Sequence, residues 1–398
     1  MIAFEPTEEQ QLLQRTARDF AANEIRPLVE RVRRDGPPEQ PWHLVKPIVA
    51  RGAELGFTRL FVPEEFGGMG GSCVDAVLLL EELGAADVGM ASDYFALTSV
   101  MPLMMLRAGS DEQKKRFLDA FMANPAMVLA GAQSEPNVAG SELMVGGPNP
   151  DAGPKLSARR DGEGWLLNGR KSAFVTNAGA ASSYMIIART APDQPAFKGL
   201  SIFHVPAGTP GLSIGPKTRL IGWPLSVHAE LILDDVRLPS DALVGPENGA
   251  AMVFAQIPEM PICLAACFVG LARASYDYAL AYARERKSVG VPIIQHQAVA
   301  LKIADMAVDL HTARLAVWDA ARACETDPMA AGMFKAPAAK TIAVDAAIRN
   351  AERCVQVLGG YGVAKEYEAG RFLNDAWVGW SCDFTRDVLR LGITQMLP

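Results

Sequence analysis

Apolar residues recur at helical spacing through the first 130 residues. They follow the segment TEEQ at 7–10, which has the pattern of a capping box, and return every three or four positions up to Leu28. Pro27 predicts that this first helix bends or ends there. A further helical stretch is predicted over 103–121, with a break at Gly109. The pattern therefore predicts an N-terminal helical domain over residues 1–129.

The pattern changes to short β-rich runs between residues 130 and 245, where prolines and glycines are dense. The runs are 165–168, 184–188, 200–205, 212–214 and 230–233. Turn residues separate them, so we expect a compact antiparallel sandwich or barrel. Residues 149–157 are predicted to be a surface loop.

Long alanine-rich helical stretches occupy the rest of the chain, from 246 to 398. They are predicted at about 262–286, 295–324 and 338–358, and they are long enough to form a bundle. The order helical, β, helical predicts three domains, over residues 1–129, 130–245 and 246–398.

Charge and hydropathy argue against several classes of protein. The chain has 398 residues and a formal net charge of −7, which argues against nucleic acid as its main partner. Its longest apolar run, residues 262–272, is too short to span a bilayer, and the start MIAFEPTEEQ has no signal-peptide pattern. We therefore expect a cytoplasmic protein that has no membrane segment.

Most common catalytic devices are missing from the sequence. Six scattered cysteines form no Cys-x-x-Cys pair, and five histidines show no metal-ligand spacing, so reduced thiols and no metal site are expected. There is also no Gly-x-Ser-x-Gly elbow and no Walker loop. A bound organic cofactor would then supply the difficult chemistry of any reaction.

Five local sequence patterns follow one another along this frame. They are QSEP at 133–136 with AGSE at 139–142, LNGRK at 167–171 with FVTN at 174–177, LILDDVRLP at 231–239 with Gly245, RKS at 286–288 with QHQ at 295–297, and QVLGGYG at 356–362. In this order and spacing they resemble the acyl-CoA dehydrogenase superfamily of flavoproteins. VPEEFGG at 62–68 and GSDEQK at 109–114 fit the same family, so the resemblance covers nearly the whole chain.

The resemblance implies an α+β multidomain fold, with an N-terminal helical domain, a middle antiparallel β domain and a C-terminal four-helix bundle. It also implies FAD as the cofactor, an acyl-CoA thioester as the substrate and an electron-transfer flavoprotein as the electron acceptor. Glycines at 359 and 360 would let a neighbouring subunit's FAD approach the backbone, which implies a homodimer or homotetramer.

Matching the motifs position by position implies a set of cofactor-binding residues. Hydroxyls at Ser134 and Thr176 suit the polar edge of a flavin, and Phe174 can cover one ring face. Arg286 and Ser288 suit a pyrophosphate. His296 is expected to form structural hydrogen bonds rather than to catalyse. The full set is Gln133, Ser134, Gly140, Ser141, Phe174, Thr176, Arg286, Ser288, His296, Gln297, Gln356, Gly359, Gly360 and Thr385.

Two of these motifs are one residue longer than the family pattern. Three residues, 137–139, separate Pro136 from Gly140 where the family usually has two. Two residues separate Lys171 from Phe174 where the family usually has one. Both extra residues fall in loops that are expected to face the flavin.

The segment SCDFTRDVLR at 381–390 takes the place of the family's Tyr-Glu-Gly-Thr segment, which often carries the catalytic base. Counting from NDA at 374–376, which matches the preceding helix end, puts Asp383 at the glutamate position. Thr385 then matches a flavin-contacting threonine, and Arg390 an arginine seven residues beyond the base. Burial would raise the pKa of such a carboxylate and make it a better base near neutral pH. Asp383 and Arg390 are the predicted catalytic residues, and a helix-capping or surface aspartate is the alternative.

Several functions remain open at this point. The first is an FAD-dependent acyl-CoA dehydrogenase, in which Asp383 removes the α-proton, a hydride goes to flavin N5 and an enoyl-CoA forms. Aspartate is shorter than glutamate by one carbon–carbon bond, roughly 1.5 Å. A nitroalkane oxidase-like enzyme of the same superfamily, which uses an aspartate base, is therefore the second. A family member that only binds acyl-CoA or a partner is the third. Glu259 lies near an alternative base position and is expected to be structural.

Overall fold

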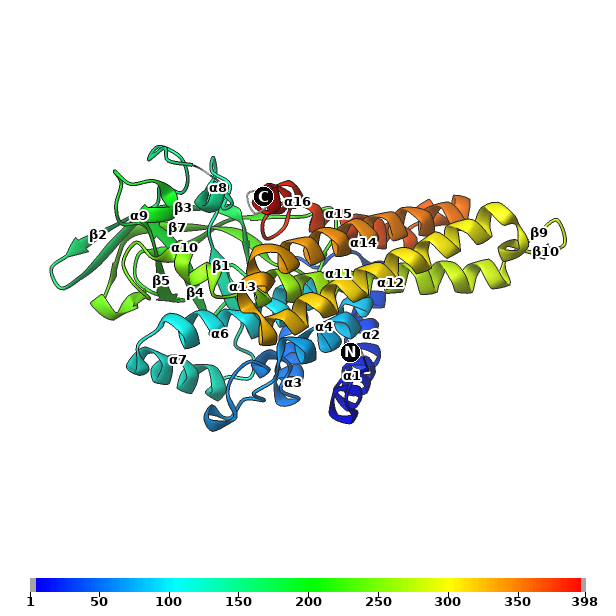
Figure 1. Ribbon diagram of the computed structural model, residues 1–398, viewed down its shortest axis with the longest axis horizontal. Coiled ribbons are helices and arrows are strands. Elements are labelled where there is room, and N and C mark those ends of the chain that lie inside the picture. Colours follow the sequence, from blue (N-terminus) through cyan, green and yellow to red (C-terminus); the bar gives the residue numbers. More distant parts are fainter. Residues whose placement is uncertain (1–4, 146, 395–398) are drawn as a thin grey trace.

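Helices make up the N-terminal part of the computed structural model, which describes residues 5–145 and 147–394 (Figure 1). They are α1 (Glu8–Phe20), α2 (Arg26–Asp35), α3 (Pro41–Glu54), α4 (Cys73–Ala86), α5 (Val88–Met90), α6 (Leu97–Ala108) and α7 (Asp111–Ala123). Two π-helical turns, η1 (Ala21–Ile25) and η4 (Ala91–Ala96), join α1 to α2 and α5 to α6, while η2 (Phe57–Arg59) and η3 (Glu64–Phe66) are short 3₁₀ turns.

Local sequence signals fix the ends of these helices. The Thr7 hydroxyl accepts a hydrogen bond from the N–H of Gln10, whose side chain accepts one from the N–H of Thr7, so the predicted capping box is confirmed. Ser110 caps α7 in the same way after the break at Gly109. At Pro27 the chain stays helical, because Pro27 lies in the first turn of α2, directly after the wide turn η1.

One eight-stranded sheet forms the middle of the chain, in the order β6-β7-β3-β2-β4-β5-β8, with β1 beside β4. The strands are β1 (Leu129–Ala132), β2 (Ser157–Asp161), β3 (Gly164–Thr176), β4 (Ser183–Arg189), β5 (Leu200–Pro206), β6 (Leu212–Thr218), β7 (His228–Leu238) and β8 (Leu243–Val244). Two short helices, α8 (Glu142–Val145) and α9 (Ala196–Gly199), and the turn η5 (Ser240–Ala242) lie between them.

All five predicted β runs lie in strands, but the sheet is mixed rather than purely antiparallel. Strand β1 pairs with β4 in parallel, because the intervening residues 133–182 form a long crossover that includes β2 and β3. Strands β1 and β2 have the sequences LAGA and SARRD, which lack the β-branched and aromatic residues that mark a strand, so neither was predicted.

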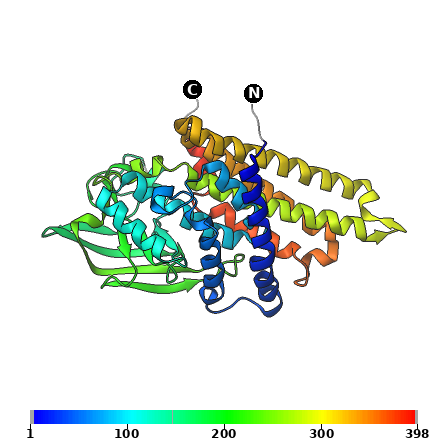
Figure 2. The same cartoon turned by 90° about the horizontal axis from the view of Figure 1, so that it is seen from below.

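The C-terminal part is a helical bundle. Its helices are α10 (Ala250–Ala255), α11 (Glu259–Glu285), α12 (Gln297–Thr326), α13 (Pro328–Ala330), α14 (Ala336–Leu358), α15 (Ala369–Ser381) and α16 (Arg386–Thr394), with the turns η6 (Ile293–Gln295), η7 (Ala331–Lys335) and η8 (Gly359–Val363). Strands β9 (Lys287–Ser288) and β10 (Val291–Pro292) form a hairpin between α11 and α12. Figures 1 and 2 both place this hairpin at the end of the molecule opposite the sheet.

Helix α4 packs directly against α11 at two glycines. A Cβ atom on Gly84 would lie 2.3 Å from the carbonyl oxygen of Cys267, and one on Gly270 would lie 2.3 Å from the carbonyl oxygen of Glu81. One hydrophobic core consequently runs through the N-terminal and C-terminal helices together, whereas the sheet encloses a second core.

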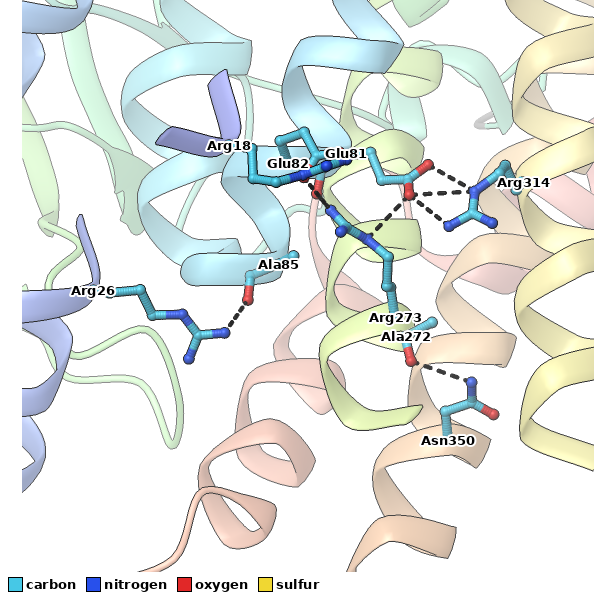
Figure 3. A network of polar contacts seen from close by, with 9 residues as sticks. All are labelled: Arg18, Arg26, Glu81, Glu82, Ala85, Ala272, Arg273, Arg314 and Asn350. Carbon is cyan, nitrogen blue, oxygen red and sulfur yellow. Dashed lines mark hydrogen bonds and ion pairs between the residues drawn. The ribbon is translucent and has the colours of Figure 1, made fainter. Parts of the chain in front are cut away.

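Buried charges accompany this contact (Figure 3). Glu81 and Glu82 on α4 are each only 3% exposed. Arg314 of α12 donates to Glu81 at 2.7 Å, and Arg273 of α11 donates to Glu82 at 2.7 Å. Arg18 of α1 also donates to Glu82, at 2.8 Å. The network thus ties α1 and α4 to the C-terminal bundle.

Candidate active site

Polar contacts join the end of β1 to the middle of β3. Gln133 and Ser134 directly follow β1, and the Ser134 hydroxyl lies 2.6 Å from that of Ser172. Lys171, which is fully buried, donates to the carbonyl of Gln133 at 3.0 Å and to the carboxylate of Glu135 at 2.9 Å. Burial lowers the pKa of the Lys171 ammonium to about 8 although the Glu135 charge favours the protonated form.

Glu135 organises the first of the two lengthened loops. Its backbone pairs with Val138, and its carboxylate accepts hydrogen bonds from the N–H groups of Lys155 and Leu156. Gly140 then passes so close to Gln133 that a Cβ would lie 2.9 Å from the Cβ of Gln133. The next residue, Ser141, is buried and directly precedes α8.

The second lengthened motif is an irregularity in the pairing of β3 with β7. Between Lys171 and Val175 an advance of four residues along β3 is matched by an advance of only two residues along β7. Phe174 lies within this irregularity and is 63% exposed, an unusual position for a large aromatic side chain. Thr176 ends the strand and pairs with His228, the first residue of β7. A flat cofactor would cover Phe174 beside the hydroxyls of Ser134 and Thr176.

His228 links this part of the sheet to the π-helical turn η4. Its Nε2 lies 3.3 Å from the carboxylate of Asp93, and both side chains are buried. Burial alone would lower the pKa of His228, but the contact with Asp93 outweighs it and raises that pKa. Burial raises the pKa of the Cys382 thiol, which directly precedes Asp383, to about 12, and the charges of Asp383 and Asp93 add to this rise. Asp93 thus acts electrostatically on both His228 and the loop that carries Asp383.

Asp383 lies in a tight loop between α15 and α16. Asp383 and Phe384 have φ values of +43° and +61°, which costs of order 1–3 kcal/mol for each non-glycine residue. Phe384 occupies the position at which the family pattern has glycine, so the backbone conformation accounts for that pattern. Thr385 directly precedes α16, and its backbone carbonyl accepts a hydrogen bond from the N–H of Leu389.

Two side chains of α14 hold this loop. The ammonium of Lys340, itself only 1% exposed, donates to the backbone carbonyls of Cys382, Asp383 and Phe384. Arg386 forms a two-pronged ion pair with Asp345, with separations of 2.6 and 2.8 Å. Motif matching could not predict either contact, because Lys340 and Asp345 lie some 40 residues before the loop.

Arg390 does not approach Asp383 in any recorded contact. It lies on α16, is 58% exposed, and has Asp387 at 3.6 Å as its ion-pair partner. The other carboxylate considered as a base, Glu259, is structural as expected: the Arg107 guanidinium binds both of its oxygens, at 2.7 and 2.8 Å.

Buried polar atoms without hydrogen-bond partners gather around the same region. Among the described residues these include Asp383 Oδ2 and His228 Nδ1, whereas His228 Nε2 and Asp93 Oδ2 have only each other, at 3.3 Å. The hydroxyl of Ser92 and the side-chain oxygen of Asn177, which follows Thr176, are unpartnered as well. Buried polar atoms are normally hydrogen-bonded, so this concentration fits a site that binds polar cofactor and substrate atoms.

The remaining predicted residues lie at the opposite end of the bundle. Arg286 ends α11 and stacks on Tyr361 at 5.6 Å, while His296, which caps α12, contacts the carbonyl of Ser288 at 3.3 Å. Gln297 begins α12. Gln356 of α14 accepts a hydrogen bond from Lys302 at 2.7 Å, and Gly359 ends that helix at φ +61°.

A pocket of about 540 Å³ unites part of this second group. Arg286, Ser288, Gly359 and Gly360 all line it. Figure 1 places the β9–β10 hairpin far from β1 and β3 within one chain. The predicted cofactor residues thus form two groups, one beside the sheet and one at the far tip of the bundle.

Another cavity, of about 720 Å³, is lined by none of the predicted site residues. It lies between α2, the loop 217–228 and α15, and His228 forms one wall. At another wall Arg371 lies 3.0 Å from Asp375, whose pKa burial raises to about 7. Trp223 donates its N–H to the same carboxylate at 2.8 Å.

Cysteine and metal chemistry have little support in the structure. All six cysteines are free. Across residues 5–145 and 147–394 there is no group of three or more His, Cys, Asp or Glu side chains that could hold a metal ion. Within the same ranges no helix combines the length and hydropathy that are needed to cross a membrane.

Comparison with known proteins gives matches along nearly the whole chain. Models of the N-terminal, middle and C-terminal domains of acyl-CoA dehydrogenase match residues 7–124, 130–236 and 247–395. The probable acyl-CoA dehydrogenase YngJ of Bacillus subtilis (strain 168) is 34% identical over 395 residues, or 99% of each chain. The mitochondrial isobutyryl-CoA dehydrogenase of Dictyostelium discoideum is 31% identical over 98% of this chain and 89% of its own length.

Solved structures show the same likeness. Butyryl-CoA dehydrogenase from Megasphaera elsdenii has a TM-score of 0.89 at 28% identity, and 99% of each chain is covered. The FAD complex of PigA has a TM-score of 0.87 at 25% identity, again over 99% of each chain.

The helical, β, helical order and the three matching domain models define the class of protein, a flavin-dependent oxidoreductase. The chain belongs to the acyl-CoA dehydrogenase family, whose members are FAD-dependent enzymes that oxidise acyl-CoA thioesters.

Proposed function

We propose that Asp383 is the base of this acyl-CoA dehydrogenase and removes the α-proton of a short or branched acyl-CoA. The observation that carries the proposal is the Asp383 loop: it holds a carboxylate with one buried, unpartnered oxygen. A carboxylate that has no internal partner is free to accept a proton from a bound substrate. The names of the isobutyryl-CoA and butyryl-CoA relatives support a small acyl group.

Residues beside the sheet would hold the reacting end of FAD. Phe174 would lie against one ring face, and Ser134, Thr176 and Thr385 would offer hydroxyls to its polar edge. Gln133, Gly140 and Ser141 would contribute backbone groups from the neighbouring loop. Bound FAD would supply the oxidant that takes the β-hydride.

The chain's own part in the reaction would be the removal of the α-proton. Asp383 takes the proton from the α-carbon, so the electron pair left there forms the new double bond as the β-hydride departs, and the product is an enoyl-CoA. One oxygen of this carboxylate, Oδ2, is buried and has no hydrogen-bond partner in the chain, so it would be the atom that accepts the proton. Arg390 would stay outside this step in the arrangement seen here.

The second group of residues would act on the cofactor of a second copy of the chain. Arg286 and Ser288 would bind its pyrophosphate, with His296 and Gln297 behind them and Gln356, Gly359 and Gly360 alongside. The active unit would therefore be a homodimer, or a homotetramer built from two such dimers. An electron-transfer flavoprotein would receive the electrons.

The test is anaerobic mixing of the yellow holoenzyme with butyryl-, isobutyryl-, glutaryl- and octanoyl-CoA and, separately, with nitroethane. The flavin absorbance should bleach with a small thioester, and Asp383→Asn should slow this by about 10²- to 10⁴-fold because a general base is lost. Asp387→Asn, which changes an exposed aspartate on α16, is the matched control and should react normally. Bleaching with nitroethane alone would instead favour the oxidase.

A further inference from the structure

Lys340 is a fully buried cation whose charged end serves only the loop that carries the proposed base. It lies in the second turn of α14. Among the described residues, no carboxylate forms an ion pair with its ammonium. Its hydrogen bonds go to three consecutive backbone carbonyls, those of Cys382, Asp383 and Phe384; the first and third are 2.5 and 2.9 Å long.

Such a cation is costly to bury unless it has a specific partner. Three carbonyl oxygens match the three N–H donors of an ammonium, so the contact satisfies the lysine completely. The carbonyls follow the C-terminus of α15, where the helix dipole also favours a positive charge. The lysine and the loop therefore stabilise each other.

The loop needs this support because its backbone is strained. Two consecutive non-glycine residues, Asp383 and Phe384, have positive φ values, and a phenylalanine is poorly suited to that conformation. The Arg386–Asp345 ion pair fixes the far end of the same loop to α14. Without Lys340 the loop would hold only at that end, and the peptide on either side of Asp383 could turn to negative φ.

We infer that Lys340 is a positioning residue for the reaction: its three hydrogen bonds lock the left-handed backbone at Asp383 and Phe384 and so aim the carboxylate. The inference rests on the proposed role of Asp383. It explains how phenylalanine can stand where the family pattern has a glycine. A glycine at 384 would adopt the same backbone without strain and would need the lysine far less.

A double-mutant cycle on the FAD-loaded enzyme tests the inference. Lys340→Met should slow thioester-driven flavin reduction at least tenfold, because a displacement of about 1 Å in a catalytic group can cost 10²-fold. Thioester affinity and FAD content should stay within threefold of the original. Phe384→Gly added to Lys340→Met should recover most of the rate. Lys335→Met, which changes a lysine paired with Asp319 shortly before α14, is the control.

A merely structural lysine would give a different pattern. Its loss would lower the melting temperature equally with Phe384 or glycine at 384, and the rate per bound flavin would not change. Either an unchanged rate in Lys340→Met or no recovery with Phe384→Gly would overturn the inference. If Lys340→Met does not fold, Lys340→Arg keeps the charge, and its planar guanidinium should still slow the reaction because it cannot match three converging carbonyls.

Hydrogen exchange separates this inference from the proposed function. It needs no substrate, so it reads the loop even if no thioester reduces the flavin. Amide exchange in a peptide spanning 380–390 should accelerate at least tenfold in Lys340→Met and return toward normal when Phe384→Gly is added. Unchanged amide exchange would overturn the proposed role of Lys340, whether or not a thioester reduces the flavin.

Discussion

Two buried lysines hold the loops beside the proposed active site. Lys171 donates to the carbonyl of Gln133 and the carboxylate of Glu135, and Lys340 donates to three carbonyls of the Asp383 loop. Their partners are 36 to 44 residues away in sequence and meet them only in the folded chain, so the fixed spacings that predicted Asp383 could not predict these contacts. Lysine spacing carries no signal of burial, so only the packing reveals both cations.

Burial of Lys171 predicts an unusual dependence of stability on pH. Its pKa is about 8 in the folded protein and returns to about 10.5 on unfolding, so the unfolded chain binds the extra proton between these values. The free energy of unfolding should therefore rise with pH from about 8 to 10, by up to roughly 3 kcal/mol, and lose this contribution as pH falls below 8. Urea unfolding at several pH values measures the effect.

Lys171→Met isolates this contribution, because methionine cannot titrate. The rise between about pH 8 and 10 should be absent from this variant and present in Lys115→Met, which changes a lysine that is 74% exposed. Parallel curves for the original protein and Lys171→Met would contradict the lowered pKa.

At the scale of elements, the sequence predicted helices better than strands. Long amphipathic repeats and capping residues marked α1, α7 and the three long bundle helices, since these signals are local. Strand β1 was missed because LAGA resembles a small-residue turn, and its pairing with β4 is set 50 residues later. The close packing of α4 on α11 was also out of reach: Gly84 and Gly270 lie within otherwise ordinary helical patterns.

The glycine contact predicts a large, local loss of stability. Gly270→Ala should lower the free energy of unfolding by about 1–3 kcal/mol or more, because the new methyl group would overlap backbone atoms of α4 that cannot rotate away. Gly392→Ala on α16 is the matched control: no atom lies within 4 Å of its added Cβ, so it should be neutral or stabilising by roughly 0.5–1 kcal/mol. Thermal and urea unfolding measure both, and equal effects would refute the steric argument.

At the scale of the whole molecule, the predicted cofactor residues form two groups, one beside the sheet and one at the β9–β10 end of the bundle (Figure 1). We expect each FAD to be held by the sheet side of one copy and the bundle tip of another. The glycines at 359 and 360 implied a neighbouring subunit, but only the fold shows that the β9–β10 hairpin lies opposite the sheet.

Mixing two inactive variants tests this arrangement. Arg286→Ala should lose FAD, and Asp383→Asn should lose activity. A mixed dimer, isolated with two different affinity tags, should nevertheless have one intact site, so about half of the normal activity should return. A mixed dimer of two Asp383→Asn chains is the control. No recovery in the isolated mixed dimer would show that each site is built from one chain.

The charged network of Figure 3 has a consequence for how the chain is made. Arg273 follows Glu82 by 191 residues in the sequence, and Arg314 follows Glu81 by 233 residues. The ribosome therefore synthesises α4, with its two acidic side chains and Gly84, long before α11 and α12, which cover them in the folded chain. Arg18 of α1 can pair with Glu82 at once, but Glu81 has no arginine until Arg273 and Arg314 are made, and burial of an unpaired carboxylate is strongly unfavourable. We therefore expect the nascent chain to keep the face of α4 around Glu81 open until most of the chain has been synthesised.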